Sequence, residues 1–458
     1  MLISHLTSRL NGVLIILTSM LVSLNEADAQ TVLSPANDGN VGPFHQQCDH
    51  HLDDCLGESI LKGACSCTGE QSSQEVFEGD RIFSRNILEE EGISFEGAVT
   101  QFYQGVTSGG LQRTFEYSGH GDYDLDFDFE KLFELKGFSL ELGSEHRFGE
   151  TVNGINGTGA SVPVALLPNL PEPETNHLAL TKVMFKQEFS PNVEVFFGKL
   201  DTLEYDTNAF ADGNGRDRFF STAFNYNPVA TRTVPFSTLG AGLKLRDDRG
   251  TSLTFLVLNT EDTATTFGID ELFADGVALV AELSVPTQFF GRNGTQMFAG
   301  TWSSKEFVSL DQSGRIDFPD IPISTVNGSW SLLWNFDQFL WQDPCDSTRG
   351  WGVFGRAGLS DGNPNAIKWS LSFGVGGNSV LPNREDDTFG IGWYYTKISD
   401  EFGPIVSSVL RDGQGVELYY KIAISEGVHV TPDLQIVQPD QVGLNTAIVP
   451  GIRMQVAF

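Results

Sequence analysis

The last segment of the chain is the feature that most constrains its fold. From Ile452 to Phe458 every even-numbered residue is apolar, whereas Arg453 and Gln455 occupy odd-numbered positions, so an extended segment would have one apolar and one polar face. The ends of soluble chains usually fray into water, and they rarely form an amphipathic strand that finishes on an aromatic residue. The pattern therefore indicates the closing strand of a bacterial transmembrane barrel, paired with the first strand. We expect Phe458 to act as the signal that the barrel-assembly machinery reads.

Shorter runs of the same kind repeat along the chain from about residue 90. The clearest is Asp122–Phe129, in which four aspartates alternate with Tyr, Leu and two Phe residues. Residues 243–246 and 251–259 also alternate, and the Asp-Asp-Arg-Gly sequence at 247–250 predicts the turn that joins them. A soluble β-sandwich would show similar alternation, but segments of about ten residues joined by turns are typical of outer-membrane barrels. Together with the last segment, these runs predict an all-β, transmembrane antiparallel β-barrel.

The first 29 residues have the three parts of a secretory signal peptide. Arg9 supplies a positive charge, Val13–Leu24 form a short apolar core, and Ala27–Ala29 place small residues at the cleavage position. The core is too short to span a bilayer comfortably, so we expect cleavage before Gln30 and export to the outer membrane. Since no later stretch is long and apolar enough for a transmembrane helix, we expect the chain to cross the membrane as paired strands.

Residues 30–80 differ from the rest of the chain and are predicted to form a short periplasmic extension. This segment is polar and holds three histidines and four of the five cysteines. In an oxidising compartment, clustered cysteines usually form disulfides, and four cysteines allow three pairings. A zinc or copper site is the alternative, although the spacing does not match that of structural zinc sites. The disulfide candidates are Cys48, Cys55, Cys65 and Cys67.

The charge balance and the lack of a catalytic motif exclude other functions. With 28 Lys+Arg against 60 Asp+Glu, the surface would repel nucleic acid, and a pore in this chain would favour cations. Gly358–Gly362 matches the G-x-S-x-G pattern, but Asn363–Asn365 continues as a turn and not as the helix that a nucleophile elbow requires. We therefore expect no enzymatic activity, and neither a metal ion nor a cofactor.

Several charged, aromatic and glycine-rich motifs follow one another beyond the extension. They are Arg85–Ile93, Gly198–Asp201 with Asn208–Phe210, Trp351–Asn365, Arg384–Gly390, Glu417–Tyr420 and Pro432–Pro439. In this order and spacing they resemble the OprB family of carbohydrate-selective porins, from about residue 80 to Phe458. The tryptophan usual upstream of the first motif is absent, and the Cys/His segment has no counterpart in the resemblance. The predicted organisation is a signal peptide (1–29), an N-terminal extension (30–80) and an OprB-like porin barrel (81–458).

The resemblance implies a barrel of about sixteen strands, assembled as a homotrimer, through which mono- or disaccharides diffuse passively. Sugars present hydroxyls at their edges and apolar C–H faces, so a selective pore needs charged side chains for the former and aromatic rings for the latter. The candidates for hydroxyl contacts are Lys199, Asp201, Arg356, Arg384, Asp387 and Glu417, and the aromatic candidates are Trp351 and Trp393. A salt bridge at a rim or turn is the alternative role of each charged residue.

Two questions stay open at this point. A non-selective general porin, or a structural outer-membrane protein whose extension tethers the cell envelope, would share most of these features. In addition, Lys199 and Asp201 share the strand face of Val195 and Phe197, which should face lipid. Either the strand has left the apolar band by Gly198, or a bulge reverses the register.

Overall fold

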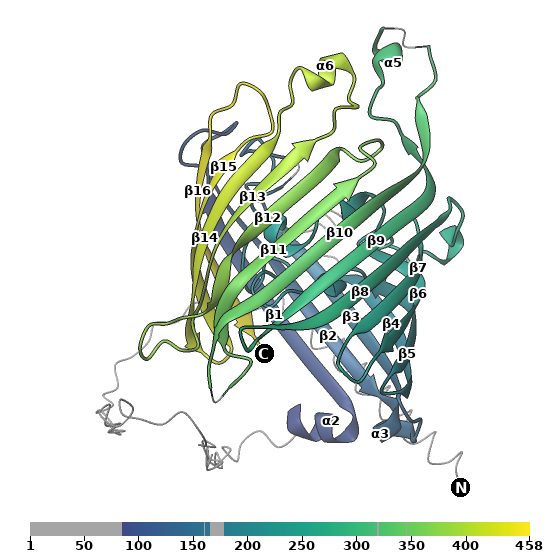
Figure 1. The fold of residues 1–458 in the computed structure, drawn as a ribbon, viewed down its shortest axis with the longest axis vertical. Helices are drawn as coiled ribbons and strands as arrows, with labels where there is room; N and C mark the ends of the chain where they lie inside the picture. The colour runs from purple at the N-terminus through teal and green to yellow at the C-terminus, as the bar shows by residue number, and fades with distance from the viewer. Residues whose placement is uncertain (1–84, 160, 165–177, 318–319, 345) are drawn as a thin grey trace, which may run out of the picture. The chain divides into compact units, whose positions relative to one another are not determined.

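The barrel is a single closed sheet. The computed structural model describes residues 85–159, 161–164, 178–317, 320–344 and 346–458. Across them, sixteen antiparallel strands each pair with the next in sequence, and the last pairs with the first (Figure 1). The predicted all-β barrel of about sixteen strands is confirmed. The predicted signal peptide and the four disulfide-candidate cysteines lie outside the described residues.

The elements have the following bounds. The strands are β1 (Ile93–Gly105), β2 (Phe115–Asp128), β3 (Phe138–Gly149), β4 (Ala179–Ser190), β5 (Val193–Asp201), β6 (Ser237–Arg246), β7 (Ser252–Asn259), β8 (Val277–Phe289), β9 (Arg292–Val308), β10 (Thr325–Gln342), β11 (Gly350–Ser360), β12 (Ile367–Asn378), β13 (Thr388–Ile398), β14 (Gly413–Ser425), β15 (Val428–Gln438) and β16 (Ala447–Ala457). The short helices are α2 (Arg85–Glu91), α3 (Phe129–Phe133), η3 (Leu203–Tyr205), α4 (Thr222–Asn225), η4 (Ala230–Arg232), η5 (Ile269–Glu271), α5 (Ser313–Asp317) and α6 (Pro404–Ser407). No helix among the described residues is both long enough and apolar enough to cross a membrane.

The last segment closes the barrel as its sequence predicts. β16 pairs with β1 in antiparallel register, with Met454 opposite Gln101. The pairing continues to the final residue, whose N–H donates to the carbonyl of Gly97 at 2.9 Å and whose carbonyl accepts from Gly97 N–H at 3.0 Å. The ring of Phe458 lies near Tyr123 of β2, with centroids 6.5 Å apart. Both rings are on the outer face of the barrel.

Alternation along β2 sorts its side chains between lumen and outer face. Of the predicted strand Asp122–Phe129, all residues but the last lie in β2, and Phe129 begins α3. Asp122 and Asp124 form ion pairs with side chains inside the barrel, whereas Tyr123 packs beside Phe458 on the outside. Successive side chains of a strand point to opposite faces, so the aspartates line the lumen and the apolar residues face lipid.

The two ends of the barrel differ in the length of their connections. At one end the connections have nine residues or fewer, and the shortest ones are tight turns such as residues 290–291 between β8 and β9. At the other end the connections are longer and include the segments that carry α5 and α6 (Figure 1). Outer-membrane barrels have short turns on the periplasmic side and long loops outside, so we call these the inner end and the outer end.

Candidate functional site: the lumen and the loop that fills it

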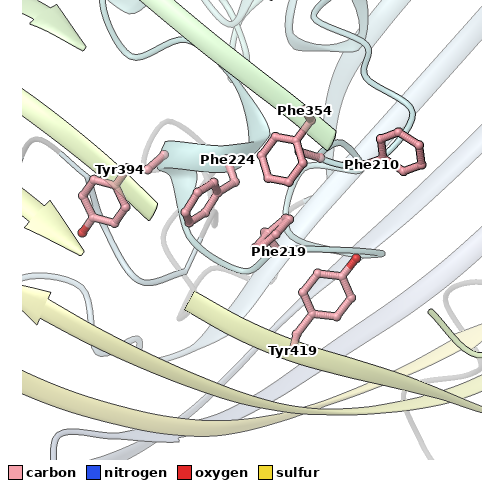
Figure 2. Close-up of a cluster of buried hydrophobic side chains, with 8 residues drawn as sticks. Phe210, Phe219, Phe224, Phe354, Tyr394 and Tyr419 are labelled. Atoms are coloured by element: carbon pink, nitrogen blue, oxygen red, sulfur yellow. The ribbon is translucent and has the colours of Figure 1, made fainter. Parts of the chain in front are cut away.

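The connection between β5 and β6 folds into the barrel, and we call these residues, 202–236, the lumen loop. Phe219 and Phe224 of this loop pack against strand residues in a buried aromatic cluster (Figure 2). The ring of Phe219 lies 5.3 Å from that of Phe354 on β11 and 4.9 Å from that of Tyr419 on β14. Buried aromatic contacts of this kind add to the area that they remove from water, so they fix the loop against one wall of the barrel.

Glycines on this wall make room for the loop. A Cβ atom at Gly392 of β13 would lie 2.5 Å from the ring of Phe224, and one at Gly390 would lie 2.7 Å from that of Phe219. Both distances are too short for any side chain. The glycine-rich sequence of these strands therefore serves the close approach of the lumen loop.

Arg356 of β11 anchors the lumen loop with polar contacts. Its side chain is buried and donates to the carbonyl of Phe224 at 2.6 Å, to the carbonyl of Asp206 at 3.1 Å and to the Asp206 carboxylate at 3.2 Å. A guanidinium can hold several acceptors at once because its five N–H donors have fixed directions. All of these partners belong to the loop, so this predicted site residue positions the loop and does not face a cavity.

Glu417 of β14 has the same role at the start of α4. Its side chain is fully buried, and its carboxylate accepts from the N–H of Phe220 at 2.5 Å and of Ser221 at 3.0 Å. These N–H groups precede the first turn of the helix, where backbone donors lack intrahelical partners. Glu417, also predicted as a sugar contact, is therefore a second anchor.

Arg453 of β16 is a third anchor, which the sequence-based candidates did not include. It donates to the carbonyls of Gly215 at 2.5 Å and Asp217 at 2.8 Å, and its guanidinium lies 4.5 Å from the centre of the Phe220 ring. The signal was present in the sequence, because Arg453 lies on the polar face of the last strand. The sequence alone does not indicate its partners, because they are backbone carbonyls of the distant lumen loop.

Lys199 and Asp201 lie at the outer end of β5. Pairing with β4 and β6 continues in register through Gly198, so no bulge is present at this point. The buried ammonium of Lys199 donates to the carbonyls of Thr263 at 2.6 Å and Thr266 at 2.8 Å, in the connection after β7. Lys199 thus fixes that connection over the end of the strand.

Asp201 is also buried, and its carboxylate begins the lumen loop. It accepts from the N–H of Leu203 at 3.0 Å, a short-range contact that turns the chain into η3. Lys199 and Asp201, which were predicted separately as sugar contacts, bind different partners. Each instead fixes a connection at the outer end.

Trp351 and Trp393 do not line the lumen, and their prediction as sugar contacts is wrong. Trp351 has the opposite parity to buried Phe354 and the same parity as exposed Leu359 on β11. Trp393 packs against Phe373 on the outer face, with ring centroids 5.4 Å apart. Aromatic residues on the outer face form the interfacial girdles of membrane barrels, which is the physical reason for their position.

Arg384 and Asp387 brace a turn at the inner end. Two guanidinium nitrogens of Arg384 donate to the two oxygens of Asp387, at 2.6 and 2.7 Å. The Asp387 carboxylate also accepts from the Tyr420 hydroxyl and from the Ala423 N–H, both at 2.9 Å. Burial alone would raise the pKa of Asp387, but Arg384 and these donors lower it. The pair is the turn salt bridge that the sequence left as an alternative.

A row of acidic side chains on β1, β2 and β3 lines another part of the lumen. We call this row the carboxylate wall; it consists of Glu96, Asp122, Asp124, Asp126, Glu141 and Glu145. Lys182 contacts Asp124 at 3.1 Å, and Arg216 of the lumen loop pairs with Asp122. None of these residues was a site candidate, although the alternation of Asp122–Phe129 was the signal that could have found them.

Two charged groups of the lumen loop have shifted pKa values. Enclosure in the barrel acts to lower the pKa of Arg216, but Asp122 and Glu145 outweigh it and raise that pKa. Enclosure acts to raise the pKa of Asp217, but Lys421 of β14 outweighs it and lowers that pKa to about 2. Both groups are therefore charged throughout the neutral range.

His120, Asp122 and Glu145 form one cluster whose donor atoms could hold a metal ion, since these atoms lie within 4.8 Å of one another. The ring nitrogens of His120 lie 3.1 Å from the Asp122 carboxylate and 2.9 Å from that of Glu145. Each nitrogen thus already faces a carboxylate, and Arg216 also pairs with Asp122. These contacts hold β2, β3 and the lumen loop together.

Open cavities lie on both sides of the lumen loop. The outer cavity has a volume of about 810 Å³ and is lined by Tyr226 and Arg232 of the loop and by Phe307 near the end of β9. Two inner cavities, of about 640 and 660 Å³, lie along the carboxylate wall toward the inner end. Arg216 lines one of them. Charged and polar side chains line part of each cavity, and such groups suit the passage of small polar solutes.

Comparison with solved structures agrees with this architecture. The chain is similar to the high-pH structure of Pseudomonas putida OprB, with a TM-score of 0.70 and 16% identity over 82% of this chain and 96% of that chain. For the low-pH structure of the same protein the TM-score is 0.52, with 15% identity over 82% and 95%. For the outer-membrane channel DcaP of Acinetobacter baumannii it is 0.50, with 10% identity over 80% and 97%. At these identities the likeness shows the fold alone.

Comparison of the sequence identifies the family. No curated protein matches the chain. The model of a family described as carbohydrate-selective porins, OprB family, matches residues 112–458, which is well over half of the chain. The chain therefore belongs to the OprB family of carbohydrate-selective porins.

Proposed function

We propose that this outer-membrane porin lets mono- and disaccharides diffuse passively into the periplasm, with a preference for sugars over other solutes of similar size. The observation that carries the proposal is the lumen loop, which is held by three buried charged anchors and has open cavities on both sides. A fixed loop gives the passage a defined shape, and shape with placed hydrogen-bonding groups is the usual basis of selectivity in pores.

The residues that meet the sugar are a different set from the anchors. Arg216 lines an inner cavity together with Glu96 and Asp124. Sugar hydroxyls can donate to these carboxylates and accept from the guanidinium, so a passing sugar exchanges hydrogen bonds with water for hydrogen bonds with the wall. Arg356 and Glu417 contribute indirectly, because they determine where the loop lies.

The alternatives keep the same fold. A general porin would pass solutes by size and charge alone, and a structural protein would use residues 30–80 to tether the envelope. An enzyme is the alternative that agrees least with the fold, because the passive passage of solutes through a porin requires no catalytic residues. We propose that the protein has no enzymatic activity.

We also propose that the protein forms a homotrimer in outer-membrane lipid, and that the barrel-assembly machinery reads Phe458. The outer face of β1–β3 carries polar residues at mid-strand: Gln101 accepts from the Tyr117 hydroxyl at 2.7 Å, and His146 stacks on Tyr123 with centroids 5.8 Å apart. Polar groups facing lipid are costly, and a neighbouring subunit would cover them. Chemical crosslinking in native membranes tests the assembly.

Single-channel conductance in a planar bilayer, titrated with glucose and with sucrose, tests the function. We expect stepwise ion conductance that either sugar blocks in a saturable way, because a bound sugar excludes ions from the same passage. Conductance that ignores every sugar would support a general porin. The absence of conductance would support the structural alternative.

A further inference from the structure

Within the part of the chain that the structure describes, Arg232 differs from the other arginines of the lumen loop because its side chain donates no hydrogen bond to a protein acceptor. Arg216 pairs with Asp122, and Arg218 donates to the carbonyl of Asn208 at 3.2 Å. The guanidinium carbon of Arg232 lies 4.7 Å from the centre of the Phe307 ring, and Asp361 is the carboxylate that acts on its charge, without a hydrogen bond between the two. Stacking covers one face of the guanidinium and leaves its N–H donors at the edge.

These donors belong to a residue that lines the outer cavity, which has a volume of about 810 Å³. That volume lies in the usual range of small-molecule sites, about 300–1,000 Å³. The cavity opens at the outer end, where β9 ends and β12 begins, so a solute from outside would enter it before it meets the anchored part of the lumen loop. Arg232 is held in a fixed orientation by η4 and the ring of Phe307.

The charges around the cavity define the class of ligand. Besides Arg232, the lining includes Lys305, which is already paired with Glu261. Its acidic residues are Glu261, Asp262, Glu306 and Asp440, against two basic residues. This excess of acid disfavours an anionic ligand. A neutral sugar has no such penalty and can accept from the arginine while it donates to carboxylates.

We propose that the outer cavity is a capture site for neutral saccharides, in which Arg232 donates hydrogen bonds to adjacent sugar hydroxyls. This inference rests on the proposed function and adds a binding step at the outer mouth. Adjacent hydroxyl oxygens match the parallel donors of a guanidinium, which is why an arginine is suited to this position and a lysine is not. The buried ring of Phe307 holds the arginine and is itself too enclosed to receive the sugar.

The test is saturable block of single-channel current by glucose, sucrose and glucuronate, added on the outer side to the full-length protein and to Arg232→Gln. We expect the affinity of Arg232→Gln for the two neutral sugars to fall about tenfold or more, since each hydrogen bond to a charged donor contributes substantially. Ion conductance itself should change little. Glucuronate should block the wild-type protein more weakly than glucose.

Two further variants control the result. Arg232→Lys keeps the positive charge and loses the planar donors, so it should weaken block nearly as much as Arg232→Gln. Arg249→Gln, in an exposed turn at the inner end, should match the wild type. Unchanged block in Arg232→Gln, or full retention in Arg232→Lys, would overturn the arginine's role, and equal block by glucuronate would overturn the neutral class. If no sugar blocks the wild-type protein, both the proposed sugar passage and the capture site are wrong. If sugars block the wild-type protein and Arg232→Gln equally, only the capture site is wrong.

Discussion

Two walls of the same lumen use charge in different ways. On the wall of β11–β14, Arg356 and Glu417 are buried, and both bind backbone groups of the lumen loop. On the carboxylate wall, by contrast, Asp124 keeps 38% of its side chain exposed and lines an open cavity. The difference follows from the neighbours. Glycines such as Gly392 let the loop approach the first wall, whereas ion pairs with Arg216 hold it at the second. A charged side chain that faces the lumen can therefore bind either the lumen loop or a solute, and the position of the loop determines which.

The largest effect is expected from removing an anchor. Arg356→Met keeps the side-chain volume but loses the bonds to Phe224 and Asp206, so the free energy of unfolding should fall by about 3–5 kcal/mol. The loop should also shift, which would raise ion conductance and abolish saturable block by sugar. Urea unfolding in lipid vesicles, followed by tryptophan fluorescence, and single-channel recording measure the two consequences.

Arg356→Lys is the matched control, because it keeps the charge and can retain one of the acceptors. It should lie between the wild type and Arg356→Met in both measurements. If stability falls in Arg356→Met while conductance and block stay unchanged, the aromatic cluster alone holds the loop, and the contrast between the two walls does not rest on the buried charges.

The next effect tests the close approach of the loop. Gly392→Ala places a Cβ within 2.5 Å of the Phe224 ring, and overpacking of this kind should lower the free energy of unfolding by about 1–3 kcal/mol. Gly300→Ala on β9 is the control, since its Cβ would lie 3.6 Å from the nearest side-chain atom, an ordinary contact. The same urea titration compares them. Equal stability of the two variants would show that Gly392 is not required for the close approach of the Phe224 ring to β13.

A smaller effect, on selectivity, is expected at the carboxylate wall. Arg216→Gln removes the cation that pairs with Asp122, so the lumen becomes more negative and the permeability ratio of potassium to chloride should rise. Reversal potentials in a salt gradient measure this ratio. Arg216→Lys keeps the charge and should leave it close to the wild-type value. A ratio that does not change in Arg216→Gln would place the ion path away from this wall.

The sequence predicted the barrel well because strand alternation is a local property. The faces of β2 and of β16 follow from the alternation of residues along each strand. The pairing of β16 with β1 joins distant segments, and it was expected because a membrane barrel has to close. Parity could also have excluded Trp351 as a lumen residue, since it differs from Arg356 by an odd number of positions along one strand. The parity of Trp351 along its strand was therefore the sequence signal that places it on the outer face.

The candidate site was predicted less well because it depends on contacts between distant segments. Arg356 meets Asp206, which lies 150 positions earlier in the chain, and no local pattern indicates that pairing. The family motifs did select Arg356 and Glu417, but for sugar contact. Selection of a residue by its motif does not distinguish a side chain that touches the solute from one that positions the loop beside it.

The smallest effect concerns acid, at the one ion pair between the lumen loop and β14 that keeps partial exposure. Asp217, whose side chain is 42% exposed, pairs with Lys421 and has a pKa of about 2, below the ordinary value of 3.8. Because the folded-state pKa is the lower one, the pair's full contribution is present above about pH 4 and is lost as the pH falls towards about 2. Sugar block measured from pH 7 downward should therefore stay constant to about pH 4 and then weaken slightly, since partly exposed pairs contribute little. Lys421→Gln removes the ammonium that lowers the pKa of Asp217, so its block should begin to weaken at a higher pH than in the wild type. If both proteins respond at the same pH, the acid response comes from the carboxylate wall and not from the anchored side of the loop.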